Sequence, residues 1–307
     1  ETDSMTRDDD IRTNAVFFDS KTRLNDQWGL LLGARYEKDT LERDFDHFRF
    51  PIDFTSKEDN DIFLPKIGLT YASSDNENFG FTVRKGYNAG GVGYNEYKQE
   101  TFIFEQEEVW TYELSSRLSY LDNRLNITAN IFYNDYENYQ AVVFGDSGHR
   151  FDNYIDNIPE GKTIGTEIEA KYWLDSGLDL FAFLGLLDTE IEESPKHTVG
   201  DISGNDFSYT PKVSAGLGFT QYLDSGFSFG ARINYVSDYY VDLANTEETQ
   251  AGNYTVINLN VGYQADDFNV HAYVKNAANR EYVVRHKNDL IEVGGPITVG
   301  VMVDYSF

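Results

Sequence analysis

The sequence predicts an all-β fold, an antiparallel up-and-down β-barrel that crosses a membrane with its strands. Three observations support this prediction. Apolar and polar residues alternate at every second position from the early part of the chain to its last residue. Aromatic residues stand at the ends of the apolar rows, where the two interfacial girdles of a membrane barrel belong. Short connections alternate with long ones, as in a simple meander.

Composition excludes several other classes of protein. The 307 residues carry 25 basic and 52 acidic side chains, a net charge of −27, so no basic stripe exists to neutralise nucleic-acid phosphates. Mean hydropathy is −0.50, and no run approaches the roughly 18 consecutive apolar residues that a membrane helix needs. The absence of cysteine excludes disulfides, thiolate zinc sites and a cysteine nucleophile. We therefore expect no nucleic-acid partner and no helical membrane span.

The strands of the first half follow one another in clear order. The first is expected at about residues 11 to 24. In each of the next examples an apolar row opposes a row of small, polar or charged residues. The apolar rows are Trp28, Leu30, Leu32, Ala34 and Tyr36; then Phe79, Phe81 and Val83; then Leu125, Ile127, Ala129, Ile131 and Tyr133. Phe132 is the exception, because it falls on the polar face.

The second half repeats the pattern with greater regularity. Its apolar rows are Phe227, Phe229, Ala231, Ile233 and Tyr235; then Ile257, Leu259, Val261 and Tyr263; then Ile297, Val299, Val301, Val303, Tyr305 and Phe307. The opposing rows are rich in Gly, Asn and Ser. A soluble sandwich would also alternate, but the aromatic ends, the polar second face and the connection lengths together favour a membrane barrel with a wet lumen.

Connection lengths predict the direction of each strand. Short turns are expected near 24–26, 73–78, 122–123, 175–176, 224–225 and 265–267, and long loops at roughly 37–60, 88–107, 144–162, 190–206, 240–252 and 277–295. This arrangement implies about thirteen strands, with short turns in the periplasm and long loops outside the cell. The first strand would then run towards the periplasm, and the last would end there.

An odd number of strands cannot close one antiparallel barrel. We therefore expect residues 1–307 to form a single barrel domain that is the C-terminal part of a longer protein, with earlier strands outside this chain. The first residues lack the basic and apolar regions of a signal peptide, so residue 1 is expected to be a mature or excised start.

Several stretches, in one order along nearly the whole chain, resemble a known family. They are Phe63-Leu64-Pro65-Lys66, Arg84 to Gly91, Trp110 to Leu114, Leu121 to Leu125, Phe132 to Tyr136, Gly161 to Glu169, Val274 to Tyr282, and the closing Pro296 to Phe307. Together they resemble the C-terminal barrel portion of a TonB-dependent outer-membrane receptor, in the iron-complex (siderophore) branch. Such receptors have about 22 strands around a plugged lumen, which implies about nine further strands and a plug domain.

The resemblance implies a function in the bacterial outer membrane. The receptor would bind a ferric siderophore or another bulky nutrient and import it actively when the TonB complex pulls on the plug. Lipid and lipopolysaccharide would surround the barrel, and the barrel assembly machinery would insert it. Two alternatives remain at this point: a TonB-dependent receptor for a saccharide or vitamin, and a passive porin.

Candidate ligand contacts are aromatic and cationic residues expected near the outer mouth. They are Tyr87, Tyr94, Tyr97, Arg150, Tyr239, Tyr240, Arg285 and His286. The terminal residues Val299, Val301, Val303, Tyr305 and Phe307 resemble an outer-membrane sorting signal. Charged residues on the polar face are expected to contact the plug or one another, namely Arg35, Glu167, Glu169, Lys171 and Arg232.

Other motifs do not indicate catalysis. No two of the histidines have the spacing of metal ligands, and Gly161-Lys162-Thr163 lacks the first glycine of a phosphate-binding loop. Acidic clusters around Glu107, Glu192 and Glu247 are expected in outer loops as a solvated surface balanced by divalent cations. We therefore expect no enzymatic activity, no cofactor and no dedicated metal site.

Overall fold

The computed structural model describes residues 5–47, 52–145, 147, 149, 151–195, 200–287 and 290–306. Thirteen strands form one antiparallel sheet in the order β1-β2-β3-β4-β7-β8-β9-β10-β11-β12-β13-β14-β17. These strands are β1 (Met5–Arg23), β2 (Trp28–His47), β3 (Ile52–Ser74), β4 (Glu77–Asn88), β7 (Glu107–Tyr120), β8 (Leu125–Phe144), β9 (Asn153–Leu174), β10 (Leu178–Glu193), β11 (Val213–Tyr222), β12 (Phe227–Val236), β13 (Tyr254–Gln264), β14 (Phe268–Lys275) and β17 (Thr298–Tyr305). The predicted number of strands in the meander is confirmed.

Three smaller elements lie within the connections. The hairpin β5 (Gly91–Asn95) and β6 (Glu100–Phe104) connects β4 to β7, and the hairpin β15 (Val283–Lys287) and β16 (Leu290–Val293) connects β14 to β17. A 3-10 helix, η1 (Glu247–Thr249), lies between β12 and β13. Among the described residues, no helix is long and apolar enough to cross a membrane.

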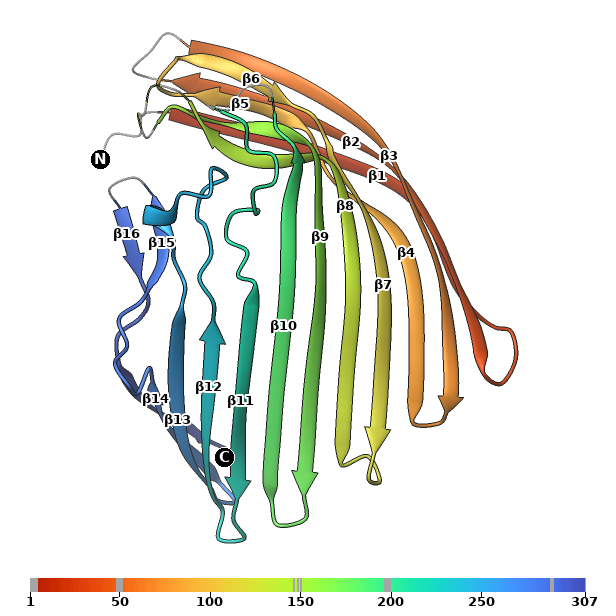
Figure 1. Cartoon of the computed structure of the whole chain (residues 1–307), viewed down its shortest axis with the longest axis vertical. Coiled ribbons are helices and arrows are strands. Elements are labelled where there is room, and N and C mark those ends of the chain that lie inside the picture. The colour runs from red at the N-terminus through yellow and green to blue at the C-terminus, as the bar shows by residue number, and fades with distance from the viewer. Residues whose placement is uncertain are drawn as a thin grey trace.

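The sheet is strongly curved, and its two ends differ (Figure 1). Tight turns gather at the bottom of the view, which we call the turn end, and the longer connections gather at the top, which we call the loop end. The tight turn after β9 requires glycine. Gly177 has φ +76°, and a Cβ there would lie 2.6 Å from the Tyr222 carbonyl oxygen. Only glycine combines that backbone conformation with so close an approach.

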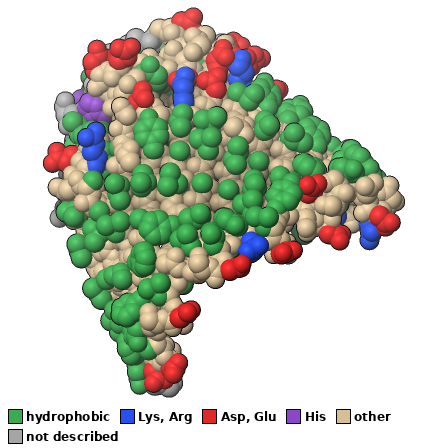
Figure 2. All heavy atoms as spheres, turned by 60° about the horizontal axis from the view of Figure 1, so that its bottom comes forward, with side chains coloured by type: hydrophobic (Ala, Val, Ile, Leu, Met, Phe, Trp, Pro, Cys, Tyr) green, Lys and Arg blue, Asp and Glu red, His purple; other side chains and the backbone are tan. Residues whose placement is uncertain are grey.

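The outer face of the sheet is apolar. Its exposed side chains include Leu32, Ile67, Leu114, Leu217 and Val261, and Figure 2 shows hydrophobic side chains over a broad field with charged groups towards its margins. Trp28 and Tyr36 bound the apolar row of β2. Eight residue steps at about 3.4 Å, tilted by about 40°, give roughly 20 Å along the membrane normal, close to the apolar band of outer-membrane barrels.

The inner face is polar, and aromatic rings cover some of its glycines. Phe132 faces Gly165 across the strands, and Phe181 faces Gly218. A Cβ on Gly218 would lie 2.4 Å from the Phe181 ring, so the missing side chain lets that ring lie flat on the wall. Arg232 lies over the same ring at 4.2 Å. The prediction that Phe132 is an inward exception agrees with this geometry.

Charged residues of the inner face pair with one another, as expected for some of them. Arg35 pairs with Glu37, and Lys171 pairs with Glu169 at 2.6 Å. Each pair joins residues two apart on one strand, which places both side chains on the same face.

The predicted extent of the long loops was wrong in several places. The interval 37–60 was expected to be a loop, but β2 continues to His47 and β3 begins at Ile52; β1 likewise begins at Met5 and not near residue 11. Strands β9 and β10 also extend into the intervals 144–162 and 190–206. Polar pairs across the strands stabilise these extensions, including Lys57–Glu42 at 2.5 Å and Thr40–Asp59 at 2.6 Å.

A hydrophobic core lies at the loop end. Its buried members come from the extended strands and from the connections above them: Ala141, Val143, Ile158, Ile191, Ile202, Phe207 and Leu243. Tyr136, Tyr139 and Tyr154 pack against it. This core fixes residues 202–207 and Leu243 against β8, β9 and β10, so part of the loop end is a rigid scaffold.

Candidate functional site

The predicted ligand residues fall into two groups at the loop end. Tyr87, Tyr94 and Tyr97 belong to β4 and to the β5–β6 hairpin, whereas Tyr239, Tyr240, Arg285 and His286 lie beyond β12 and in β15. Arg150 lies outside the described residues. The structure therefore does not bring the predicted residues into a single cluster.

Tyr87 forms part of a polar cluster with β2. Its hydroxyl lies within hydrogen-bond distance of the carboxylates of Glu37 and Asp39, two residues apart on the inner face, and donates its single proton to one of them at a time. Burial, together with these two carboxylates, raises the pKa of the Tyr87 phenol. The phenol therefore stays protonated at neutral pH and serves as a donor to the carboxylates.

Tyr94 and Tyr97 lie on the β5–β6 hairpin in different surroundings. The Tyr94 ring packs against Phe45 of β2, with ring centroids 5.1 Å apart, and burial raises the pKa of the Tyr94 phenol. Tyr97 lies in the hairpin turn, is 48% exposed, and stacks on His149 at 4.7 Å. Tyr97 thus offers an exposed ring to the mouth, while Tyr94 is held in the interior.

A buried polar pair fixes the hairpin turn. The Asn95 side-chain amide donates to Asp152 at 2.9 Å, and its oxygen accepts from the backbone N–H groups of Tyr97 and Lys98. Asp152 is fully buried, and burial alone would raise its pKa, but hydrogen bonds from Ser147 and Asn95 outweigh that effect and the pKa lies below its usual value. The carboxylate therefore stays charged and holds the turn.

The second group surrounds Tyr209. Arg285 lies over the Tyr209 ring at 6.0 Å, and Tyr239 lies 6.3 Å from the same ring. The Tyr239 hydroxyl donates to the Val284 carbonyl at 2.8 Å, which ties β15 to the connection after β12. The backbone carbonyl of Tyr240 accepts from the Tyr209 N–H at 2.7 Å. His286 is half-buried in β15 and pairs in register with Ile291.

Sequence reasoning missed three residues of these groups. Tyr209 adopts φ +62° and is 44% exposed. His149 and Asp152 complete the surroundings of the first group. The sequence alone does not show that these residues meet; Asn95 and Asp152, for example, are 57 positions apart.

A hollow of about 440 Å³ lies beside the second group. Its wall includes Asp238, Asn253, Arg280, Glu281 and Tyr282. Tyr282 stacks on Tyr254 at 4.1 Å. The hollow therefore combines an aromatic wall with both positive and negative side chains, a mixture suited to a ligand with planar and polar parts.

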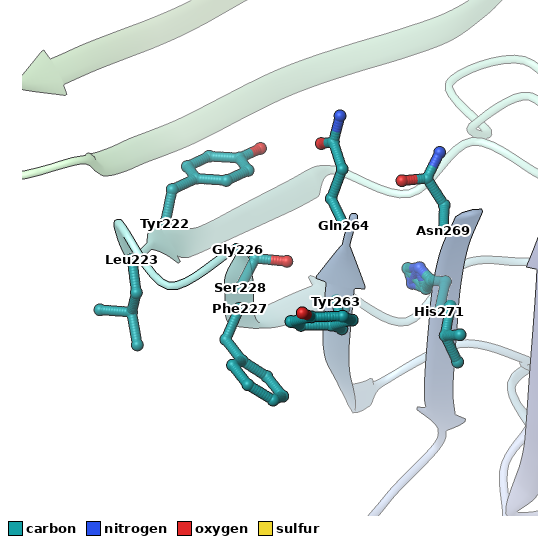
Figure 3. A pocket seen from close by; sticks show the side chains of 11 residues that line it. Tyr222, Leu223, Gly226, Phe227, Ser228, Tyr263, Gln264, Asn269 and His271 are labelled. Atoms are coloured by element: carbon teal, nitrogen blue, oxygen red, sulfur yellow. The ribbon is translucent and has the colours of Figure 1, made fainter. Parts of the chain in front are cut away.

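A second hollow, of about 430 Å³, lies at the turn end (Figure 3). Tyr222, Gln264 and Asn269 point to one side of the sheet, and Phe227 and Leu223 point to the other. His271 lies beside Asn269 and 6.3 Å from Tyr273. This hollow is remote from every predicted ligand residue.

Two of the three acidic clusters lie mainly in strands and not in loops, whereas Glu247 and Glu248 lie in the connection between β12 and β13, as predicted. Glu107 and Glu108 belong to β7, and Glu190, Glu192 and Glu193 belong to β10. Several carry cationic partners, such as Lys85 on Glu108 at 2.5 Å and Lys162 on Glu192 at 2.6 Å. Within the described part of the chain, no group of three or more His, Asp or Glu residues could hold a metal ion.

The residues expected to form a sorting signal occupy the last strand. Val299, Val301, Val303 and Tyr305 lie on β17 and are all more than 60% exposed. Their register partners on β14 are the apolar Val274, Ala272, Val270 and Phe268. Phe307 lies outside the described residues.

Comparisons with known proteins agree with this architecture. Residues 2–277 match the family model described as TonB dependent receptor-like, beta-barrel. A protein described as a probable TonB-dependent siderophore receptor, PiuA of Acinetobacter baumannii, is 25% identical over 250 residues, which cover 77% of this chain and 33% of that protein.

Solved structures show the same fold. The crystal structure of the siderophore receptor PiuA from Acinetobacter baumannii superposes with a TM-score of 0.81 at 20% identity, covering 97% of this chain and 43% of that one. The ferric yersiniabactin uptake receptor FyuA from Yersinia pestis also gives 0.81 at 20% identity, covering 99% of this chain and 47% of that one. This chain thus spans less than half the length of these relatives. It belongs to the TonB-dependent receptor-like β-barrel family of the bacterial outer membrane.

Proposed function

We propose that this chain is the barrel part of a receptor that imports a ferric siderophore or a similar iron complex. The family match over residues 2–277 carries the proposal, together with relatives described as receptors for siderophores. The exposed aromatic rings and cationic side chains of the loop end also support it, because they suit a bulky complex with planar chelating groups. This function is binding and gated transport and includes no bond chemistry.

We infer the mechanism from the family match together with the polar inner face of the sheet. The ligand binds first at the loop end and then passes along the polar inner face. Further strands and a plug outside this chain complete a barrel of about 22 strands, in keeping with this chain's coverage of 43% and 47% of the PiuA and FyuA structures. The TonB complex pulls on the plug and weakens the site, because a site of fixed affinity would retain its cargo.

The eight residues predicted from sequence remain the proposed surroundings of the ligand, either as direct contacts or as residues that shape the mouth. Two of them are the best placed for direct contact, since Tyr97 and Arg285 are exposed at the loop end. Tyr87 and Tyr239 already donate hydrogen bonds within the protein, so we assign them to the shape of the mouth. Lipopolysaccharide is the proposed neighbour of the charged outer surface above the apolar band, and β17 with Phe307 is the proposed signal to the barrel assembly machinery.

Ligand binding to the full-length protein in detergent tests the proposal. Ferric catecholates, ferric hydroxamates and oligosaccharides would be titrated while intrinsic fluorescence is recorded. We expect saturable binding of one ferric complex below micromolar concentration, weakened about tenfold or more by Tyr97→Ala or Arg285→Ala. Tyr263→Ala, on the outer face near the turn end, is the matched control and should bind normally. Binding of sugars alone, or ion conductance without ligand binding, would contradict the proposal.

A further inference from the structure

Residues 280–285, which we call the strap, run from the hollow at the loop end to the ring of Tyr209. The strap follows β14 and enters β15, and Arg280 and Tyr282 line the hollow of about 440 Å³. Arg285 lies over the Tyr209 ring at 6.0 Å. Figure 1 shows β15 at the loop end, above β13 and β14. The strap therefore holds part of the wall of the hollow and the exposed Arg285 on one short piece of backbone.

The two arginines of the strap differ from other cations of the loop end, such as Lys162, which pairs with Glu192 at 2.6 Å. Both are exposed, and within the residues that the structure describes neither Arg280 nor Arg285 forms an ion pair. Glu292 of β16 is the register partner of Arg285, but the two side chains do not pair. In a chain with a net charge of −27, the strap therefore keeps positive charge available to a ligand.

Asn276 fixes the beginning of the strap. Its side chain is 3% exposed; the side-chain oxygen accepts from the Arg280 N–H at 2.8 Å, and the amide donates to the Arg280 carbonyl at 2.9 Å. The same amide donates to the Gly295 carbonyl at 3.0 Å. The Asn276 N–H in turn donates to the side chain of Asn258 on β13, also at 3.0 Å. Displacing the strap would leave this buried side chain without partners, which is costly.

Three consecutive carbonyls, those of residues 282–284, hold the rest of the strap. Each accepts a hydrogen bond from a different segment of the chain. The donors are, in order, the N–H groups of Gly294 and Gly252 and the hydroxyl of Tyr239, at 2.8, 3.0 and 2.8 Å. Arg285 comes directly after these carbonyls, so three segments together determine where its backbone lies.

The rings of Tyr282 and Tyr239 are fixed as well. Tyr282 stacks on Tyr254 at 4.1 Å, and a Cβ on Gly294 would lie 1.9 Å from the Tyr282 ring. Tyr239 exchanges two backbone hydrogen bonds with Ala251, at 2.9 and 3.0 Å. Burial raises the pKa of the Tyr239 phenol, so its hydroxyl stays protonated and donates to the strap. Of the three donors to the strap carbonyls, only this hydroxyl belongs to a side chain, so a substitution can remove it alone.

We propose that the strap presents Arg285 in a fixed position to anionic oxygens of the ligand, and that Tyr239 is the positioning residue. An arginine whose backbone is already held loses less conformational freedom when the ligand binds. Its guanidinium offers a fork of N–H donors that suits paired anionic oxygens. The receptor therefore prefers an anionic iron complex to a neutral one of similar size. The fixed strap is a property of the fold, whereas this preference rests on the proposed function.

Amide hydrogen exchange tests the strap without any ligand. Tyr239→Phe removes the hydroxyl and keeps the ring. In the full-length protein in nanodiscs, this variant should speed exchange of the Gly252 amide, which donates to Val283, by about threefold or more. Tyr120→Phe is the matched control, because the Tyr120 hydroxyl donates to Glu77 at 2.8 Å at the turn end, and it should leave exchange at Gly252 unchanged. Unchanged exchange at Gly252 in Tyr239→Phe would overturn the proposal.

Ligand binding tests the positioning role. A ferric tris-catecholate is anionic, whereas a ferric tris-hydroxamate is neutral. We expect the receptor to bind the tris-catecholate more tightly, and we expect Arg285→Gln to weaken that binding about tenfold and Tyr239→Phe about threefold. Binding of the tris-hydroxamate should change by about twofold or less in both variants. In the Arg285→Gln background, Tyr239→Phe should have no further effect, because a positioning residue acts through Arg285.

The outcomes separate the strap from the function. Additive losses in the double variant, or equal losses for the two complexes, would overturn the positioning role. Tighter binding of the neutral complex by the unmodified receptor would overturn the preference for an anionic ligand. If the unmodified receptor binds neither complex, the proposed function fails, while the exchange experiment still decides whether the strap is held by Tyr239.

Discussion

Phe207 is the residue on which the rigidity of the loop end most depends. Its ring stacks on Tyr139 at 4.5 Å, meets Tyr136 edge-on at 5.8 Å, and is 4% exposed. A Cβ on Gly161 would lie 2.8 Å from the ring, so the strand beneath also conforms to it. Phe207→Ala would leave a cavity between the connection after β10 and the wall of β8 and β9.

The cost of this substitution follows from burial and cavity formation. Replacing a buried Phe by Ala lowers the free energy of unfolding by about 3–5 kcal/mol, including the contribution of the cavity that is left. The strands below the core are held by their own backbone hydrogen bonds. We therefore expect this loss of stability to appear as local unfolding of residues 202–209. At about 1.4 kcal/mol per factor of ten, a loss of 3–4 kcal/mol speeds amide exchange there roughly 100- to 1,000-fold.

Hydrogen exchange measured by mass spectrometry on the full-length protein in nanodiscs tests this value. The informative amides are those of Gly204, which donates to the Ile191 carbonyl, and of Asn205, which donates to Ile202. Phe229→Ala is the control, because Phe229 lies on the outer face of β12 and is 45% exposed. If amide exchange at these positions accelerates less than threefold in a folded Phe207→Ala protein, the conclusion that this ring holds residues 202–209 against the strands is refuted.

Three other predictions address the wall and the charges. Ile67→Arg, midway along the lipid-facing row of β3, should destabilise the barrel by about 2–4 kcal/mol in unfolding from lipid vesicles, and a neutral result would contradict the lipid-facing assignment. Gly218→Val should cost about 1–3 kcal/mol in the same assay because it displaces the Phe181 ring, whereas Gly185→Ala, with its nearest neighbour at 3.7 Å, should cost little. Hydrogen bonds from Arg43 and Arg7 hold the pKa of Asp9 below its usual 3.8. The contribution of Asp9 to stability is therefore present above about pH 4 and is lost as the pH falls further. Amide hydrogen exchange in the upper part of β1 that accelerates between pH 6 and 5 would disprove this.

The wall of the barrel could be predicted from sequence because lipid imposes a strict rule on it. Outward side chains from Trp28 to Tyr36 face the lipid, so every second residue of this segment is apolar without a break. Inward-facing positions are mostly small or polar, but they also accept an aromatic residue such as Phe132. Gly165 lies opposite that ring, and such a match across two strands becomes visible only once the register is known.

The extended strands could not be predicted in the same way. Above the apolar band, most residues of β2 and β3 are polar or charged, so apolar alternation disappears although the backbone ladder continues. What replaces it is cross-strand pairing, as in Lys57 with Glu42. Such pairs resemble ordinary loop composition when they are read along a single chain.

The positions of the site residues depend on contacts between distant segments. Local sequence correctly marked Tyr97 and Arg285 as residues of the loop end, but it could not show that the Tyr87 hydroxyl already lies against the carboxylates of Glu37 and Asp39. The same limit applies to Arg43, which looks like one more surface charge in an acidic strand. One guanidinium bonds both Asp9 and Val92, 34 and 49 positions away, and such a link becomes visible only in the folded chain. Arginine can make both contacts at once because its planar guanidinium carries five N–H donors in a fixed geometry.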